Sequence, residues 1–116
     1  MTKVKSEVVR SKDLGLVYWG RVEAKQAVSS DGKMIGLVRG ILVDPKTWTI
    51  PYLVAEGNKD ALEKLSIQGG DLVTIPTRFV KSVSYMVELN TDLTSMIGAI
   101  SEYKIERSEK KTDFRT

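Results

Sequence analysis

The chain of 116 residues contains no cysteine and no histidine. Without cysteine it forms no disulfide and offers no thiolate nucleophile. Without histidine it lacks the most frequent general acid or base and the most frequent protein ligand of metal ions. Together the two absences exclude zinc, haem and iron–sulfur sites of the usual kinds, so we expect no metal, no cofactor and no enzymatic activity.

Long apolar segments are missing as well. No apolar run approaches the roughly 20 residues that a membrane-spanning helix needs. The first ten residues are charged and lack the apolar stretch of a secretory signal. We therefore expect a cytoplasmic protein that does not insert into the membrane. With 41% hydrophobic and 28% charged residues, the composition predicts one globular domain.

The net charge of +3 is concentrated at the two ends of the chain. Residues 1–13 hold four basic and two acidic residues, and residues 104–116 hold five and three. The middle of the chain holds nine basic and ten acidic residues. A nucleic-acid interface needs a basic face on the folded body, interleaved with aromatic side chains. Because the excess lies at the ends, we expect no nucleic-acid partner.

Short β-type segments separated by turn residues fill most of the chain. They predict strands over residues 22–28, 34–43, 50–56, 71–75 and 85–89, and a short link or strand over residues 79–83. Asp31-Gly32 predicts a type I′ hairpin turn, in which both central residues have positive φ. Gly36 and Gly40 interrupt the longest strand, which is apolar on both faces, and indicate a bulge or a sharp bend.

One short helix is expected over residues 59–65, with Asn58 as its N-cap and Gly69-Gly70 after its end. Beyond residue 90 two periodicities conflict, one helical and one typical of a strand. We place a short helix over residues 92–97 and a strand over residues 100–106. The change falls at Gly98, because glycine commonly ends a helix.

Several sequence blocks follow one another in a characteristic order. Val28-Ser-Ser-Asp-Gly-Lys33 precedes Ile35-Gly-Leu-Val38 and Ile41-Leu-Val-Asp44, and Asp71-Leu-Val-Thr-Ile-Pro76 precedes Val80-Lys-Ser-Val83. The series, within residues 22–89, resembles the PRC-barrel family, which includes the photosynthetic reaction-centre H subunit and the ribosome maturation factor RimM. The chain departs from the usual pattern at Gly40 and at Trp48, where an acidic residue and a glycine are common.

The resemblance implies a mainly β fold with one short helix. A small PRC-type β-barrel would span residues 22–89, after a lead segment over residues 1–21. A C-terminal extension over residues 90–107 would pack on the barrel or at a dimer interface, and residues 108–116 would form a flexible tail.

The family carries no catalytic motif, so the resemblance implies a function in binding. The membrane helix of the reaction-centre subunit is missing, and we expect 21 leading residues to be too few for the N-terminal domain of RimM. The chain is more similar to free-standing archaeal PRC-barrel proteins, such as CdpB-like adaptors of FtsZ-based cell division. That similarity implies a self-associating scaffold, recruited to the division site at the membrane. Its partner would be a SepF-like membrane tether or a paralogous PRC-barrel protein; a RimM-like ribosome or RNA assembly factor is the alternative.

Four residues are candidates for partner binding. Trp48 lies in a turn where glycine would suit the backbone better, and it either folds back onto its own sheet or is exposed as an anchor. Tyr52 follows shortly after and would complete the same patch. Arg39 and Arg78 are further candidates as charged anchors, although solvated strand edges are the favoured reading.

Two apolar segments lie outside the expected barrel. In the lead segment, Tyr18 and Trp19 either plug one end of the barrel, which we favour, or anchor an interface. In the extension an apolar stripe either covers the barrel opening or forms a dimer interface, and we favour the interface because so small a barrel has little room for more core. The stripe consists of Leu93, Met96, Ile97 and Ile100.

Overall fold

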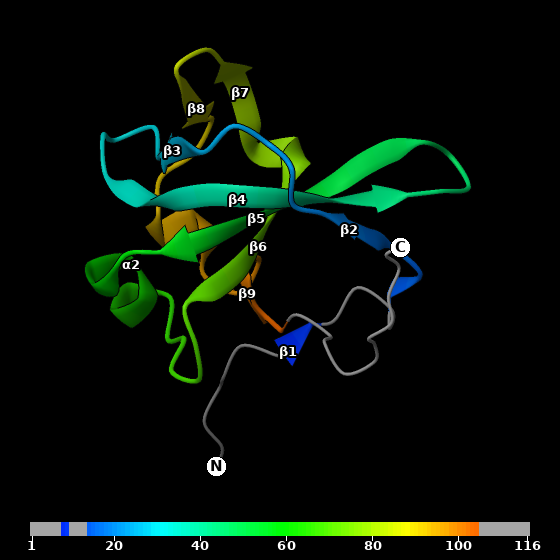
Figure 1. The fold of residues 1–116 in the computed structure, drawn as a ribbon. Coiled ribbons are helices and arrows are strands. Elements are labelled where there is room, and N and C mark those ends of the chain that lie inside the picture. Colours follow the sequence, from blue (N-terminus) through cyan, green and yellow to red (C-terminus); the bar gives the residue numbers. More distant parts are fainter. Residues whose placement is uncertain (1–7, 10–13, 105–116) are drawn as a thin grey trace.

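The computed structural model describes residues 8–9 and 14–104 (Figure 1). The strands are β1 (Val8–Val9), β2 (Val17–Trp19), β3 (Lys25–Val28), β4 (Met34–Asp44), β5 (Thr49–Gly57), β6 (Leu72–Pro76), β7 (Val80–Val83), β8 (Met86–Leu89) and β9 (Ser101–Tyr103). The helical elements are α2 (Lys59–Lys64) and the 3₁₀ turns η1 (Thr77–Phe79) and η2 (Thr94–Met96). A mainly β fold with one short helix is confirmed. Across the described ranges, no helix is long and apolar enough to cross a bilayer.

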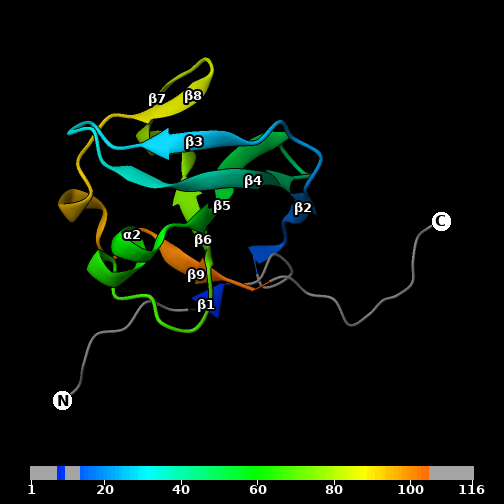
Figure 2. The same cartoon turned by 60° about the vertical axis from the view of Figure 1, so that its left-hand side comes forward.

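All nine strands belong to one hydrogen-bonded sheet. Its order is β1-β9-β6-β5-β4-β3-β8-β7, and β2 pairs with β4 outside this path. The end strands β1 and β7 are not paired with each other in the part of the chain that the structure describes, so the sheet is not closed. The closed barrel expected from the sequence is therefore replaced by an open sheet, whose β7–β8 hairpin projects to one side (Figure 2).

The lead segment and the C-terminal extension take part in the same sheet. β2 pairs antiparallel with the outer half of β4, with Tyr18 opposite Leu42. β9 pairs with β6 and, in parallel, with β1. β9 lies within the strand expected over residues 100–106, whereas β1 and β2 were not expected, because strands of two or three residues are too short to show a periodicity. The expected tail over residues 108–116, and the last residues of the strand expected over 100–106, lie outside the described residues.

The long strand β4 bends where the glycines indicated. The pairing register between β4 and β5 shifts between Val38 and Gly40, which leaves Arg39 as a bulged residue. At Gly36 an added Cβ would lie 2.2 Å from the carbonyl oxygen of Glu56. The strand therefore needs glycine at position 36, since backbone atoms of β5 cannot move aside for a side chain.

The β3–β4 turn is not the type I′ turn that was expected. Gly32 has a φ of +84°, and Asp31 does not share the positive φ. The Gly32 N–H donates to the Ser29 carbonyl at 3.0 Å, and the Ser29 N–H donates to the Lys33 carbonyl at 2.8 Å. A register shift between Ala27 and Val28 accommodates the longer loop. Only one residue has to adopt the left-handed conformation, because the loop has more residues than a two-residue turn.

The short helix begins and ends on local hydrogen bonds. Asn58 accepts a hydrogen bond from the Ala61 N–H at its side-chain oxygen, 2.9 Å away, which confirms it as the N-cap. At the other end Ser66 adopts a φ of +63°. The Ile67 N–H donates to the Leu62 carbonyl at 3.0 Å, the pattern of a Schellman motif. The helix thus ends at a serine, three residues before Gly69.

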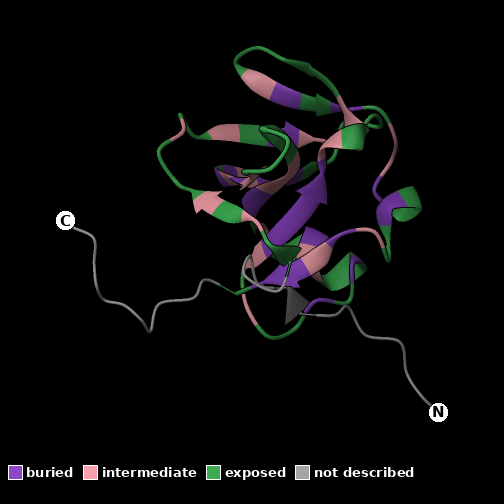
Figure 3. Ribbon diagram, turned by 90° about the vertical axis from the view of Figure 1, so that its right-hand side faces the viewer, coloured by how far each residue is buried: buried purple, intermediate pink, exposed green. Residues whose placement is uncertain are grey.

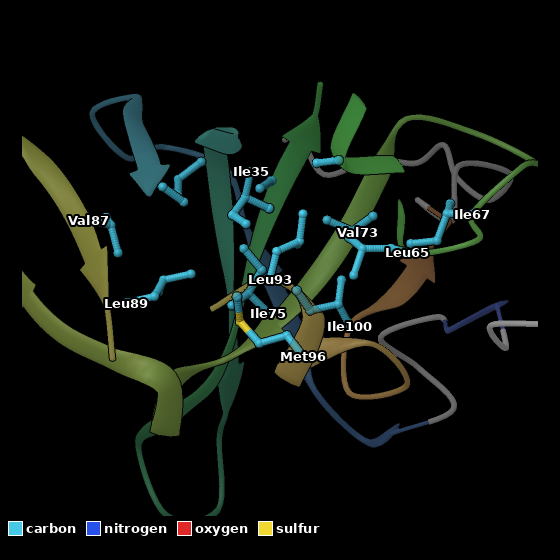
Figure 4. Close-up of a cluster of buried hydrophobic side chains, with 14 residues drawn as sticks. Ile35, Leu65, Ile67, Val73, Ile75, Val87, Leu89, Leu93, Met96 and Ile100 are labelled. Carbon is cyan, nitrogen blue, oxygen red and sulfur yellow. The ribbon is translucent and has the colours of Figure 1, made fainter. Parts of the chain in front are cut away.

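The main hydrophobic cluster lies between the sheet, α2 and the segment that precedes β9 (Figure 4). Leu93 is 4% exposed, and Met96 and Ile100 are fully buried in this cluster. The expectation that these three side chains form a dimer interface is corrected, because they fill the core of their own chain. Ile97 alone of the stripe is exposed, at 49%. The helix expected over residues 92–97 is reduced to η2, and Gly98 has the positive φ expected for its end.

A second, smaller cluster covers the opposite face of the sheet. Its buried members are Leu42, Val54 and Tyr103, and Tyr18 and Tyr52 pack against them. Burial is concentrated in the central strands, whereas the turn ends of the β4–β5 and β7–β8 hairpins carry exposed and half-buried residues (Figure 3). The fold therefore has a buried centre, from which the turn ends of the two hairpins extend with exposed side chains.

Candidate functional site

The most exposed aromatic side chain stands at the tip of the β4–β5 hairpin. Trp48 is 80% exposed and has a φ of +57°, in the left-handed region that favours glycine. Its N–H donates to the Asp44 carbonyl at 2.7 Å, and the Asp44 carboxylate accepts from the Lys46 N–H at 2.9 Å. The tip is therefore held in one conformation. Of the two places that the sequence left open for Trp48, the structure shows the exposed one.

Tyr52 does not join Trp48 in one exposed patch. Its side chain is half-buried and packs against the second cluster, where it stands opposite Leu42 in the β4–β5 ladder. The sequence places the two aromatics close together, but the register turns Tyr52 toward the sheet face that the chain itself covers. Tyr52 is consequently part of the packing beneath the hairpin.

The two arginines lie in different surroundings. The Arg39 guanidinium donates to Glu56 Oε1 from Nη2 at 2.8 Å and from Nε at 3.0 Å, with both side chains about half exposed. Such an exposed ion pair contributes little to stability. Arg78 is exposed in η1, and its guanidinium carbon lies 4.7 Å from the centre of the Phe79 ring. The structure thus places Arg39 and Arg78 on separate elements, apart from the hairpin tip.

The two aromatics of β2 point to opposite faces of the sheet. Tyr18 stacks on Tyr103, with ring centroids 5.8 Å apart. The Tyr18 ring also covers Gly40 so closely that a Cβ on this glycine would lie 2.7 Å from the ring. Burial raises the pKa of Tyr18 above its ordinary value, and the nearby Arg39 charge partly offsets this effect. Trp19 is 53% exposed. The favoured reading, in which both aromatics plug a barrel end, is corrected: Tyr18 packs on one face of the open sheet, and Trp19 is exposed at the surface.

An apolar groove lies between the β7–β8 hairpin and the face of β4 and β5. Its volume is about 590 Å³, and aliphatic side chains form most of its lining. Val38, Ile41 and Leu53 come from the sheet, and Val80, Val83 and Val87 come from the hairpin. The groove occupies the place where a closed barrel would continue its core. We name it the apolar groove.

The groove residues were not among the sequence candidates, although one signal pointed to them. A strand that is apolar on both faces, as β4 is, needs cover on both sides. Val80 and Val83 line the same groove despite their odd spacing, because the register between β7 and β8 shifts between Val80 and Ser82. A bulge of this kind cannot be seen in four residues of sequence.

Acidic side chains do not gather into a site. Within residues 14–104, the structure shows no group of three or more acidic residues that could hold a metal ion.

No protein-family model matches the chain, and no curated protein matches it. The geometry therefore directs attention to the exposed apolar surfaces: the Trp48 tip and the apolar groove.

Proposed function

We propose that this protein is a non-catalytic adaptor that binds another protein through the tip of its β4–β5 hairpin. The observation that carries the proposal is Trp48, exposed on a left-handed backbone. Holding a non-glycine residue in that conformation costs about 1 kcal/mol or more, and an exposed indole returns no burial energy. Trp48 therefore lowers the stability of the folded chain. In an interface the same side chain can raise affinity, because tryptophan is frequent among the residues that dominate binding.

The proposed setting follows from the resemblance to the PRC-barrel family. The partner would be a SepF-like membrane tether or a paralogous PRC-barrel protein, in FtsZ-based division of an archaeal cell. The protein would be cytoplasmic, self-associate and reach the division site through its partner. The order of the sequence blocks between residues 22 and 89 supports this setting.

The test replaces Trp48 with residues that suit the backbone. Trp48→Gly and Trp48→Asn relieve the left-handed conformation, so the melting temperature should stay level or rise slightly. Affinity for a purified SepF-like protein, measured by titration calorimetry, should fall at least tenfold, because losing an anchor of this kind typically costs about 2 kcal/mol. Tyr85→Ser is the matched control, since Tyr85 is equally exposed, at 79%, on the other hairpin.

Three outcomes would contradict the proposal. Early melting of both variants would assign Trp48 to the fold. Unchanged affinity would place the partner surface elsewhere. Binding to RNA that weakens steeply with salt, without affinity for the SepF-like protein, would favour the RimM-like alternative, because phosphate contacts release counterions.

A further inference from the structure

Exposed apolar side chains are concentrated around the apolar groove. The described part of the chain has nine large apolar residues that are exposed. Five of them line the groove or stand beside it: Val17, Trp19, Ile50, Val83 and Tyr85. A monomer rarely exposes so many large apolar side chains around one groove without a partner for them.

The sheet register places β2 on the groove side. Trp19 stands opposite Ile41, which lines the groove, and Val17 stands opposite Val43. Directly opposed residues of an antiparallel pair share a face. Trp19 and Val17 therefore extend the apolar floor of the groove outward along the β4–β5 hairpin.

The same surface also carries a projecting part. Val83 is 60% exposed at the end of β7, and Tyr85 follows it in the loop before β8. β8 pairs with β3, and the turn end of the β7–β8 hairpin projects from the body (Figures 1 and 2). A concave groove and a convex hairpin lie side by side on one surface. A two-fold rotation can then place the hairpin of each copy in the groove of the other.

The charges of the groove also favour a second copy. Among the residues that the structure describes, the charged ones that line the groove are Glu23 and Lys25, whose side chains lie 3.7 Å apart as an ion pair. A two-fold axis brings like surfaces together, and a groove without net charge meets its own copy without repulsion. A strongly charged partner segment would find no complementary net charge among these lining residues.

The available area is sufficient for a modest dimer. Covering the five side chains would bury roughly 500 Å² per copy, or about 1,000 Å² in total, which reaches the lower limit of specific interfaces. From these observations we infer that two copies of this chain associate about a two-fold axis, with the β7–β8 hairpin of each copy seated in the apolar groove of the other. The inference rests on the self-association included in the proposed function and adds the surface that performs it.

The dimer is tested by analytical ultracentrifugation over a range of concentrations. Val83→Glu and Tyr85→Ser should each raise the dimer dissociation constant at least tenfold, since every substitution acts twice in a two-fold interface. Ile97→Asp is the matched control, because Ile97 is exposed outside the groove. It should leave the dimer intact.

A cross-linking experiment examines the contact directly. The chain has no cysteine of its own, so introduced cysteines are unique. Ser84→Cys, in the exposed turn of the hairpin, mixed with Ile50→Cys should give a disulfide-linked heterodimer under mild oxidation. Ser84→Cys mixed with Ile97→Cys should not.

The outcomes separate this inference from the proposed adaptor function. A wild-type monomer at high micromolar concentration would overturn the dimer. Dissociation by Ile97→Asp but not by Tyr85→Ser would move the interface to the C-terminal segment and overturn it equally. Trp48→Gly should remain dimeric, and Tyr85→Ser should keep its affinity for the SepF-like protein, so either proposal can fail without the other.

Discussion

The two faces of the β4–β5 hairpin differ in what covers them. On one face Tyr18 and Tyr103 close over Gly40 and Val54, and the chain supplies its own cover. On the other face the inner part is sealed by the main cluster, whereas the outer part opens into the apolar groove. Both faces carry apolar residues in the sequence. The difference shows that an apolar residue becomes core or surface according to whether another segment reaches it.

The largest difference is expected between two neighbours of the C-terminal segment. Ile100 is fully buried in the main cluster and Ile97 is exposed. Ile100→Asp should unfold the protein, since an unpaired charge in the core costs more than about 4 kcal/mol. Ile97→Asp should change the free energy of unfolding by less than about 0.5 kcal/mol. Urea titration of both variants checks the comparison, and a folded Ile100→Asp protein would contradict the closed core.

A substitution at Gly40 tests the packing of the sheet face that Tyr18 and Tyr103 cover. In Gly40→Ala the new methyl group would lie 2.7 Å from the Tyr18 ring and displace it from Tyr103. Crowding of this kind typically costs about 1–3 kcal/mol. A double-mutant cycle with Tyr18→Ala should show strong coupling, because the clash requires the ring. Additive effects on thermal unfolding would mean that Tyr18 does not lie over Gly40.

A pair of identical substitutions compares the closed centre with the open groove. Val73 is fully buried and Val83 is 60% exposed. Val73→Thr introduces a hydroxyl into the core and should cost about 1–3 kcal/mol. Val83→Thr should cost less than about 0.5 kcal/mol when measured at concentrations where the protein is monomeric. Equal losses in chemical denaturation would show that the groove is as closed as the core.

The smallest effect concerns pH and the sheet face that Tyr18 and Tyr103 cover. Burial raises the pKa of Tyr18 in the folded protein above its ordinary value of 10.0. The unfolded chain therefore loses this proton at a lower pH than the folded chain. The part of the folding stability that depends on protonated Tyr18 is fully present below pH 10. It is lost as the pH rises through the pKa of Tyr18 in the folded protein. Stability measured across this alkaline range should fall less in Tyr18→Phe than in the wild type, and an equal fall would contradict the partial burial of Tyr18.

The elements that the sequence predicted well are those specified by local interactions. The strands over residues 34–43, 50–56 and 71–75 reappear within two residues at each end, because turn residues bound them on both sides. The helix and its Asn58 cap follow from one side chain and one backbone N–H. The sequence predicted that Trp48 lies in a turn, but it left open whether the side chain is exposed or packs on its own sheet.

The sequence by itself determined the fold class, the short helix and the lack of histidine and cysteine chemistry, since composition and short-range spacing control all three. Only the tertiary structure decided that Ile100 is core, that Tyr52 packs inward and that the apolar groove stays open. Each of these depends on contacts between segments distant in the chain. A bulge of one residue is enough to turn a side chain to the other face, because side chains alternate with a period of two along a strand.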